Sequence, residues 1–96
     1  MPLFRPPQAV ARVAAQALAD RRKYGRGGTP VGVRRAVRLV KRVPIDAAEV
    51  RTIRAWFARH AHLSRYRADR TSAAAISWGL WGGAPCRAWI RSLGVS

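Results

Sequence analysis

Residues 72–89 read SAAAISWGLWGGAPCRAW and contain Trp78, Trp81 and Trp89, three of the four tryptophans in the chain. Trp78 and Trp81 are three positions apart, which makes them neighbours on one face of a helix. Gly82-Gly83 predicts a break after this helix, and Pro85 is suited to the first turn of a last short helix. Because this stretch is the densest source of apolar area, we expect it to close the hydrophobic core.

The chain length of 96 residues suits one domain with one modest core. We predict an all-α fold, a compact bundle of four to five short helices over residues 8–96. Residues 1–7 precede it as a flexible or extended proline-rich arm, because proline fixes φ and biases the residue before it away from helix.

Start and stop signals place the expected helices at about residues 8–24, 30–43, 47–62 and 73–81. Gly25 is suited to the left-handed position after the first helix, and Thr29-Pro30 is a typical N-cap and N1 pair for the second. Asp46 and Glu49 resemble a capping box, with Ile45 and Val50 placed for a hydrophobic staple. Either Thr71 or Ser72 caps the fourth helix.

The second helix is strongly two-faced in sequence. Val33, Ala36, Val37 and Val40 follow the i, i+3, i+4, i+7 spacing of a buried stripe, and cations occupy most of the remaining positions. The first helix is expected to bury Val10, Val13, Ala14, Ala17 and Leu18. The third is expected to bury Val50, Ile53 and Phe57, with Trp56, His60 or Ala61 as further candidates.

The charge balance is extreme, with 19 Lys+Arg against 4 Asp+Glu and a formal net charge of +15. Such self-repulsion favours a polyanionic or acidic partner, although a GC-rich genome would also raise the arginine content. The candidate nucleic-acid-binding residues are Arg21, Arg22, Lys23, Arg26, Arg34, Arg35, Arg38, Lys41, Arg42, Arg51 and Arg54. We expect those of the second helix to contribute most.

Two connecting segments have an alternative functional interpretation. The segment Gly25-Arg26-Gly27-Gly28 lacks the Gly-Lys-Ser/Thr ending of a P-loop, so we predict a helix connection, although its N–H groups could hold a phosphate. Tyr66 lies among Arg65, Arg67 and Arg70. Stacking on a nucleic acid and covering the core are equally good interpretations of this tyrosine.

The residues needed for catalysis or for binding a metal or cofactor are not assembled in the sequence. His60 and His62 point to different helix faces and have no carboxylate or second sulfur nearby. We expect His60 to be a half-buried packing residue and the single Cys86 to lie in the core. No signal peptide or membrane span is recognisable, which predicts a location in a host cytoplasm or a virion.

Three segments together resemble a small helical module of tailed-bacteriophage proteins, associated with prohead-protease and head-morphogenesis regions. They are RGGTPVGVRRA at 26–36, WFARH at 56–60 and SAAAISWGLWGG at the start of 72–89. The resemblance implies a phage lineage and carries over no catalytic residue. This chain departs from the module at Ala61, Leu63 and Ala84, where the family pattern has acids, and these losses favour contact with a polyanion.

The leading functional hypothesis is therefore non-enzymatic, largely sequence-independent nucleic-acid binding through phosphate contacts, with DNA favoured over RNA. The alternative is a structural virion component, such as a minor capsid or connector protein. Its arginines would meet an acidic partner, and Trp78, Trp81 and Trp89 would form a subunit interface. Membrane disruption by a cationic chain is disfavoured by the helix caps and glycine stops, which indicate a folded domain.

Overall fold

The computed structural model describes residues 2–62 and 69–96. These two ranges contain five helices: α1 (Gln8–Tyr24), α2 (Pro30–Val40), α3 (Ala47–Arg59), α4 (Ala73–Leu80) and α5 (Gly83–Ser92). The all-α prediction is confirmed. Within the described ranges, no helix has both the length and the apolar character that a bilayer span requires.

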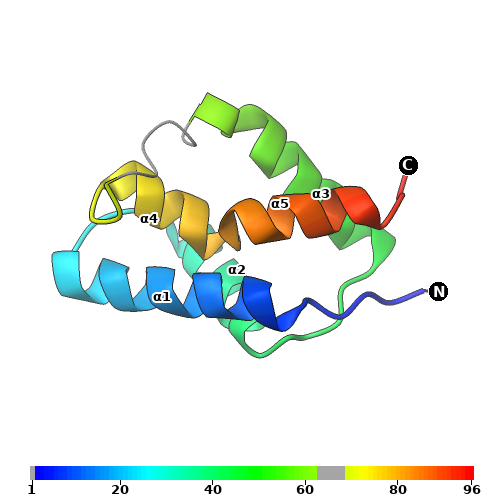
Figure 1. Ribbon diagram of the computed structural model, residues 1–96, viewed down its shortest axis with the longest axis horizontal. Coiled ribbons are helices and arrows are strands. Elements are labelled where there is room, and N and C mark those ends of the chain that lie inside the picture. The colour runs from blue at the N-terminus through cyan, green and yellow to red at the C-terminus, as the bar shows by residue number, and fades with distance from the viewer. Residues whose placement is uncertain (1, 63–68) are drawn as a thin grey trace.

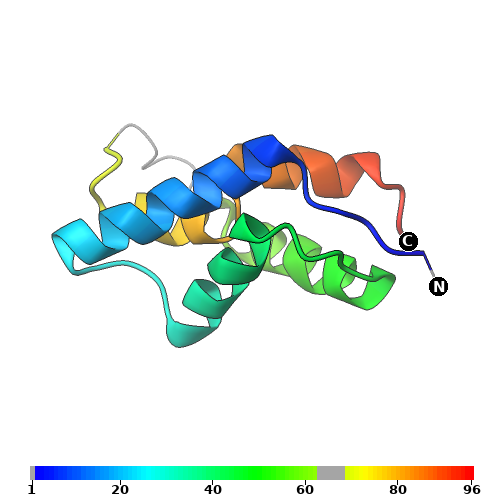
Figure 2. The same ribbon diagram turned by 90° about the horizontal axis from the view of Figure 1, so that it is seen from below.

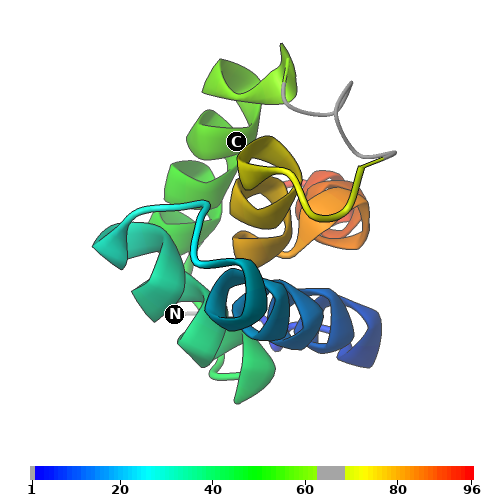
Figure 3. The ribbon, with the colours of Figure 1, turned by 90° about the vertical axis from the view of Figure 1, so that its left-hand side faces the viewer.

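The helices form two layers. In Figure 1, α4 and α5 follow one another in a nearly continuous line that runs antiparallel to α1. Helices α2 and α3 both lie on one face of the layer formed by α1, α4 and α5 (Figures 2 and 3). The α4–α5 junction is made by Gly82 and Gly83, whose φ angles of 95° and 63° are in the left-handed region that glycine adopts without strain.

The helix caps explain why the first four helices begin close to their predicted residues and why α1 ends where predicted. Helix α3 ends at Arg59, before the predicted end near His62. Gly25 has a φ of 65°, and its N–H donates to the Arg21 carbonyl at 2.8 Å. Thr29 and Ser72 accept hydrogen bonds from backbone N–H groups in the first turns of α2 and α4. These side chains satisfy donors that a helix N-terminus otherwise leaves unpaired.

The tryptophan-rich stretch closes the core, as predicted. Trp78 and Trp81 are 3% and 6% exposed, and Trp81 stacks on Trp56 of α3 with ring centroids 4.8 Å apart. Phe57 meets Trp78 edge-on at 5.0 Å. These large rings therefore hold α3 against α4.

The buried stripe predicted for α2 is confirmed at Ala36 and in part at Val33, which packs half-buried against the core, and is wrong at Val37 and Val40. The buried residues are Gly32, Ala36 and Leu39, whereas Val37 and Val40 are 37% and 38% exposed. Gly32 faces α4, where a Cβ would lie 3.4 Å from Trp81 Nε1 and 3.6 Å from Leu80 Cδ1, which is ordinary van der Waals contact. Packing of α2 against both α1 and α4, and not the row of valines, determines which face of α2 is buried.

Helix α2 also ends earlier than predicted, at Val40 and not near Val43. Arg42 adopts a φ of 53°, in the left-handed conformation that commonly terminates helices, and Val43 precedes a proline. The Arg42 side chain offsets this strain, since its Nε donates to the Pro6 carbonyl at 2.7 Å.

The N-terminal arm is extended and attached to the domain. Phe4 and Ile45 exchange two backbone hydrogen bonds, of 2.8 and 2.9 Å, in an antiparallel bridge. Pro6 is buried, and Ile45 is 1% exposed. Of the two conformations predicted for residues 1–7, the structure has the extended one over residues 2–7.

The glycines between α1 and α2 serve close packing. The Gly28 N–H donates to Ser77 Oγ of α4 at 2.7 Å, so that donor is already occupied. A Cβ at Gly27 would lie 2.7 Å from Ile76 Cβ and 3.0 Å from the Ala73 carbonyl oxygen. The connection therefore lies directly on α4, which supports its interpretation as a helix connection.

We expect Gly27→Ala to destabilise the protein by about 1–3 kcal/mol more than Gly25→Ala. Both glycines have positive φ, but a Cβ at Gly25 meets nothing within 4 Å, so the difference isolates the contact with α4. Urea unfolding of the two variants followed by circular dichroism measures it. Equal losses of stability would contradict the packing role of Gly27.

Candidate nucleic-acid interface

All four carboxylates have partners within the fold. Asp20, only 4% exposed, accepts from Gln16 Nε2 at 2.9 Å and pairs with Arg70 at 3.3 Å. Asp69 accepts from the hydroxyl and the N–H of Thr71, and these two hydrogen bonds lower the pKa of Asp69 below its ordinary value. Asp46 accepts from a backbone N–H of α3, and Glu49 pairs with arginines of α2. Asp20 and Glu49 pair with arginines of other segments, Asp46 and Asp69 stabilise local turns, and most of the positive charge remains uncompensated.

Of the two hydrogen bonds that define the predicted capping box, one is present. The Asp46 side chain accepts from the Glu49 N–H at 2.9 Å, as expected of an N-cap, and Ile45 and Val50 are both buried. The Glu49 carboxylate does not return to the Asp46 N–H. It pairs instead with Arg35 at 2.9 Å and Arg38 at 3.2 Å, because charge-assisted bonds to two guanidinium groups are stronger than a bond to a neutral amide.

Arg35 is a structural residue and not a free phosphate ligand. Its side chain is 15% exposed, and the guanidinium lies over the Trp81 ring at 5.6 Å from the centroid. With Glu49 on α3 and Trp81 at the end of α4, this one side chain connects three helices. Its assignment to the binding surface is therefore not supported by its position.

Four more of the predicted binding residues donate to backbone carbonyls. These contacts tie loops and termini to the helices, although each guanidinium keeps its charge. The pairs are Arg21 with Gly27 (2.9 Å), Arg26 with Thr71 (2.8 Å), Arg42 with Pro6 (2.7 Å) and Arg54 with Val95.

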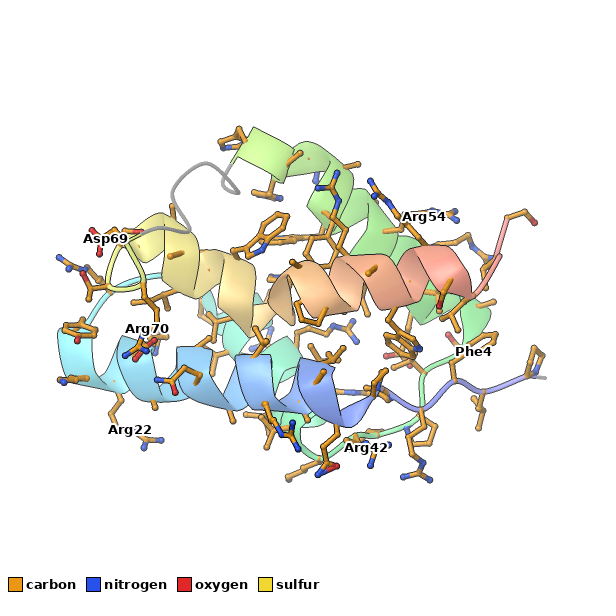
Figure 4. All side chains as sticks on the ribbon, viewed as in Figure 1. Phe4, Arg22, Arg42, Arg54, Asp69 and Arg70 are labelled. Carbon is orange, nitrogen blue, oxygen red and sulfur yellow. The ribbon has the colours of Figure 1, made fainter. Side chains whose placement is uncertain are left out.

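The other predicted cations are exposed, but they do not share one face. Arg34, Arg38 and Lys41 form an i, i+4, i+7 row on the outer side of α2. Arg22 projects away from α1, whereas Arg54 lies beside α3 and α5 on the opposite side of the view in Figure 4. Lys23 and Arg51 are also exposed. The eleven predicted residues therefore surround the domain.

A groove between α3 and α5 gathers three arginines. Arg54, Arg87 and Arg91 line it together with Phe57, Ala58 and Ile90, and its volume is about 120 Å³. No carboxylate belongs to the described lining. Arg87 and Arg91 were not predicted, although their i, i+4 spacing on the helix expected after Pro85 was a usable signal.

The tryptophans proposed for self-association are mostly inaccessible. Trp78 and Trp81 belong to the core, and Trp89 is only half-buried. An interface through Trp78 or Trp81 would require the core to open. The proposed contacts of Arg65, Tyr66 and Arg67 lie outside the described residues.

The histidines and the cysteine have packing roles. His60 is half-buried, stacks on Trp56 at 4.4 Å and has its Nδ1 2.8 Å from the Trp56 carbonyl oxygen. Burial raises the pKa of the Cys86 thiol to about 12, so it stays protonated and is a poor nucleophile. Within residues 2–62 and 69–96, no group of three or more His, Cys, Asp or Glu side chains is placed to hold a metal ion.

Comparisons with protein-family models, with curated proteins and with solved structures found no significant match. The phage lineage therefore rests on the motif resemblance alone and stays a prediction.

We expect Arg35→Ala to destabilise the domain by about 1–3 kcal/mol, because it removes a partly buried ion pair and a cation–π contact. Arg34→Ala, one residue along on the exposed side of α2, should change stability by less than about 0.5 kcal/mol. Thermal unfolding of both variants at low salt tests the distinction. A stable Arg35→Ala protein would mean that the guanidinium is available to a ligand.

Proposed function

We propose that this protein is a non-enzymatic nucleic-acid-binding domain that contacts the phosphate backbone without base-specific recognition. The single observation that carries the proposal is the α3–α5 groove. Three arginine side chains line it beside apolar side chains, and every acidic side chain is engaged elsewhere. Guanidinium groups bind phosphate oxygens in a fixed, bidentate geometry.

The groove is matched to a phosphate in size and charge. Its volume of about 120 Å³ is small, and its described lining has no group that would repel an anion. Arg54 is held by the Val95 carbonyl, so one of its donors is already oriented by the fold. A backbone phosphate seated there would relieve repulsion among the three arginines.

The α2 row gives a second, weaker contact. Arg34 and Lys41 are exposed, and neither has a carboxylate partner among the described residues. Their role is long-range attraction and additional phosphate contact, not recognition of bases. Together the two surfaces explain how one small domain binds a polyanion of any sequence. A place in a phage particle or in genome packaging is part of this proposal.

The test is the salt dependence of binding to short duplex DNA, single-stranded DNA and RNA. We expect affinity to fall steeply with salt for the native protein, because each phosphate contact contributes a slope of about −0.9 in log K against log salt for B-DNA. Arg87→Gln with Arg91→Gln should reduce that slope by about 2, and Arg34→Gln with Lys41→Gln by about 1. Fluorescence anisotropy at several salt concentrations measures these slopes.

The matched control is Arg12→Gln with Arg59→Gln, which removes the same charge from exposed positions outside both surfaces. It should change the slope by less than about 1, because only general attraction is lost. If the control and the groove variant lose affinity equally, net charge and not the groove carries binding. A flat salt response of the native protein would reject the proposal.

A structural virion role is the second candidate, and the exposed apolar residues of α2 favour it. Val31, Val37 and Val40 are 54%, 37% and 38% exposed beside Arg34 and Lys41. Such a mixed surface suits contact with a protein partner.

If the second role is correct, light scattering of nuclease-treated protein should show a stable oligomer. The double substitution Val37→Ser and Val40→Ser should dissociate that oligomer into monomers. Nucleic-acid affinity should be unchanged by this double substitution. A monomer that binds DNA as described above would contradict this role.

A further inference from the structure

A larger pocket lies between α1 and the α4–α5 line, away from the arginine groove. Its volume is about 290 Å³, close to the lower limit of about 300 Å³ for small-molecule sites. Most of its walls are apolar, and Val13, Ala17, Ile76, Gly79 and Pro85 are among them. An occupant must therefore have a substantial apolar body.

One end of this pocket holds an unpaired hydrogen-bond donor. Trp78 lines the pocket and is 3% exposed, and its indole Nε1 has no hydrogen-bond partner. The Cδ1 and Nε1 edge of the ring faces Gly83, at 3.6 and 3.7 Å from where a Gly83 Cβ would be. A buried donor without a partner destabilises the protein, so an acceptor supplied at this point would be favoured.

The same end contains the first turn of α5. Gly82 is the N-cap and contributes no side-chain hydrogen bond, and the first turn has no acidic residue. Gly83 and Ala84 of this turn line the pocket beside Trp78. Helix N-terminal N–H groups favour an anion, so they and the indole N–H select the same kind of ligand atom.

At the opposite end of the pocket, the negative charge of Asp20 is balanced by the positive charge of Arg70. The buried Asp20 carboxylate pairs with Arg70 at 3.3 Å and accepts from Gln16 at 2.9 Å. Asp20 is two helical turns along α1 from Val13, which lies beside Gly83, and this spacing corresponds to roughly 10 Å. An anion at the α5 end would therefore lie far from Asp20.

We propose that this pocket binds a small monocarboxylate with an apolar body. The carboxylate accepts from the Gly83 and Ala84 N–H groups, since Pro85 has none, and from Trp78 Nε1–H, and the apolar body lies along Ala17 and Ile76. Because Nε1 is covered in the empty pocket, binding requires a small shift at the Gly82–Gly83 junction. This site is independent of the arginine groove and of the proposed nucleic-acid binding.

The test is a titration of the ¹⁵N-labelled protein with 3-phenylpropionate, followed through the indole N–H signal of Trp78. We expect a saturable shift of this signal in the millimolar range, larger than the shifts of the other tryptophan indoles. Acetate, which lacks the apolar body, and 3-phenylpropan-1-ol, which lacks the charge, should each bind at least several-fold more weakly. Trp78→Phe identifies the signal.

A matched pair of variants separates the pocket from general attraction to a basic protein. Ala84→Glu places a carboxylate at the first turn of α5, which suits a helix N-terminus, and should abolish the response of Trp78 to the probe. Ala88→Glu adds the same charge one turn further along α5, where the residue is exposed and outside the pocket, and should leave the response within twofold of the native value.

Three results would overturn the proposal. They are no shift of the Trp78 indole signal with 3-phenylpropionate, an equal shift with acetate, and equal loss of the response in Ala84→Glu and Ala88→Glu. The first would mean that the indole N–H is met by water alone. The others would mean that anions bind by charge without using the pocket.

Discussion

The chain has few acidic residues to balance its basic ones, and the structure depends on where those few acidic side chains lie. Four carboxylates serve a chain with 19 lysines and arginines, and each carboxylate is placed where it connects segments. Glu49 on α3 holds two guanidinium groups of α2, and Asp20 on α1 holds Arg70 just before α4. Asp46 and Asp69 stabilise the starts of α3 and of the turn before α4. Little negative charge is left to screen the surface.

Several arginines connect segments of the chain by donating hydrogen bonds to backbone carbonyls, which requires no carboxylate. Arg21, Arg42 and Arg54 each reach a backbone carbonyl of a loop or a terminus, and Arg35 stacks over Trp81 while it pairs with Glu49. Neutral carbonyl acceptors allow a basic chain to connect its segments without further acids. The arginine content therefore has two uses: some side chains connect segments, and others, such as Arg34, Arg87 and Arg91, remain available to an external anion, with Arg54 of the α3–α5 groove in both groups. A count of basic residues cannot separate these uses.

Local signals predicted most of the fold, because capping depends on residues close in sequence. Thr29, Asp46 and Ser72 cap the helices expected of them, and the tryptophans close the core. The buried face of α2 was missed because it depends on packing against α1 and α4, which contain residues distant in sequence. The groove and the pocket join α3 with α5 and α1 with α4 and α5, so no local pattern predicts them. The contacts of Arg35 with Glu49 and Trp81 also join residues distant in sequence, so the sequence did not predict them.

The central claim is that uncompensated positive charge opposes folding when no anion is bound. It is tested most directly by the urea unfolding midpoint of nucleic-acid-free protein, measured from low to high sodium chloride. Because salt screens repulsion between exposed charges over a Debye length of about 10 Å at 0.1 M, stability should rise with salt. A midpoint that falls as salt is added would show that the few ion pairs outweigh the repulsion, and would contradict the account.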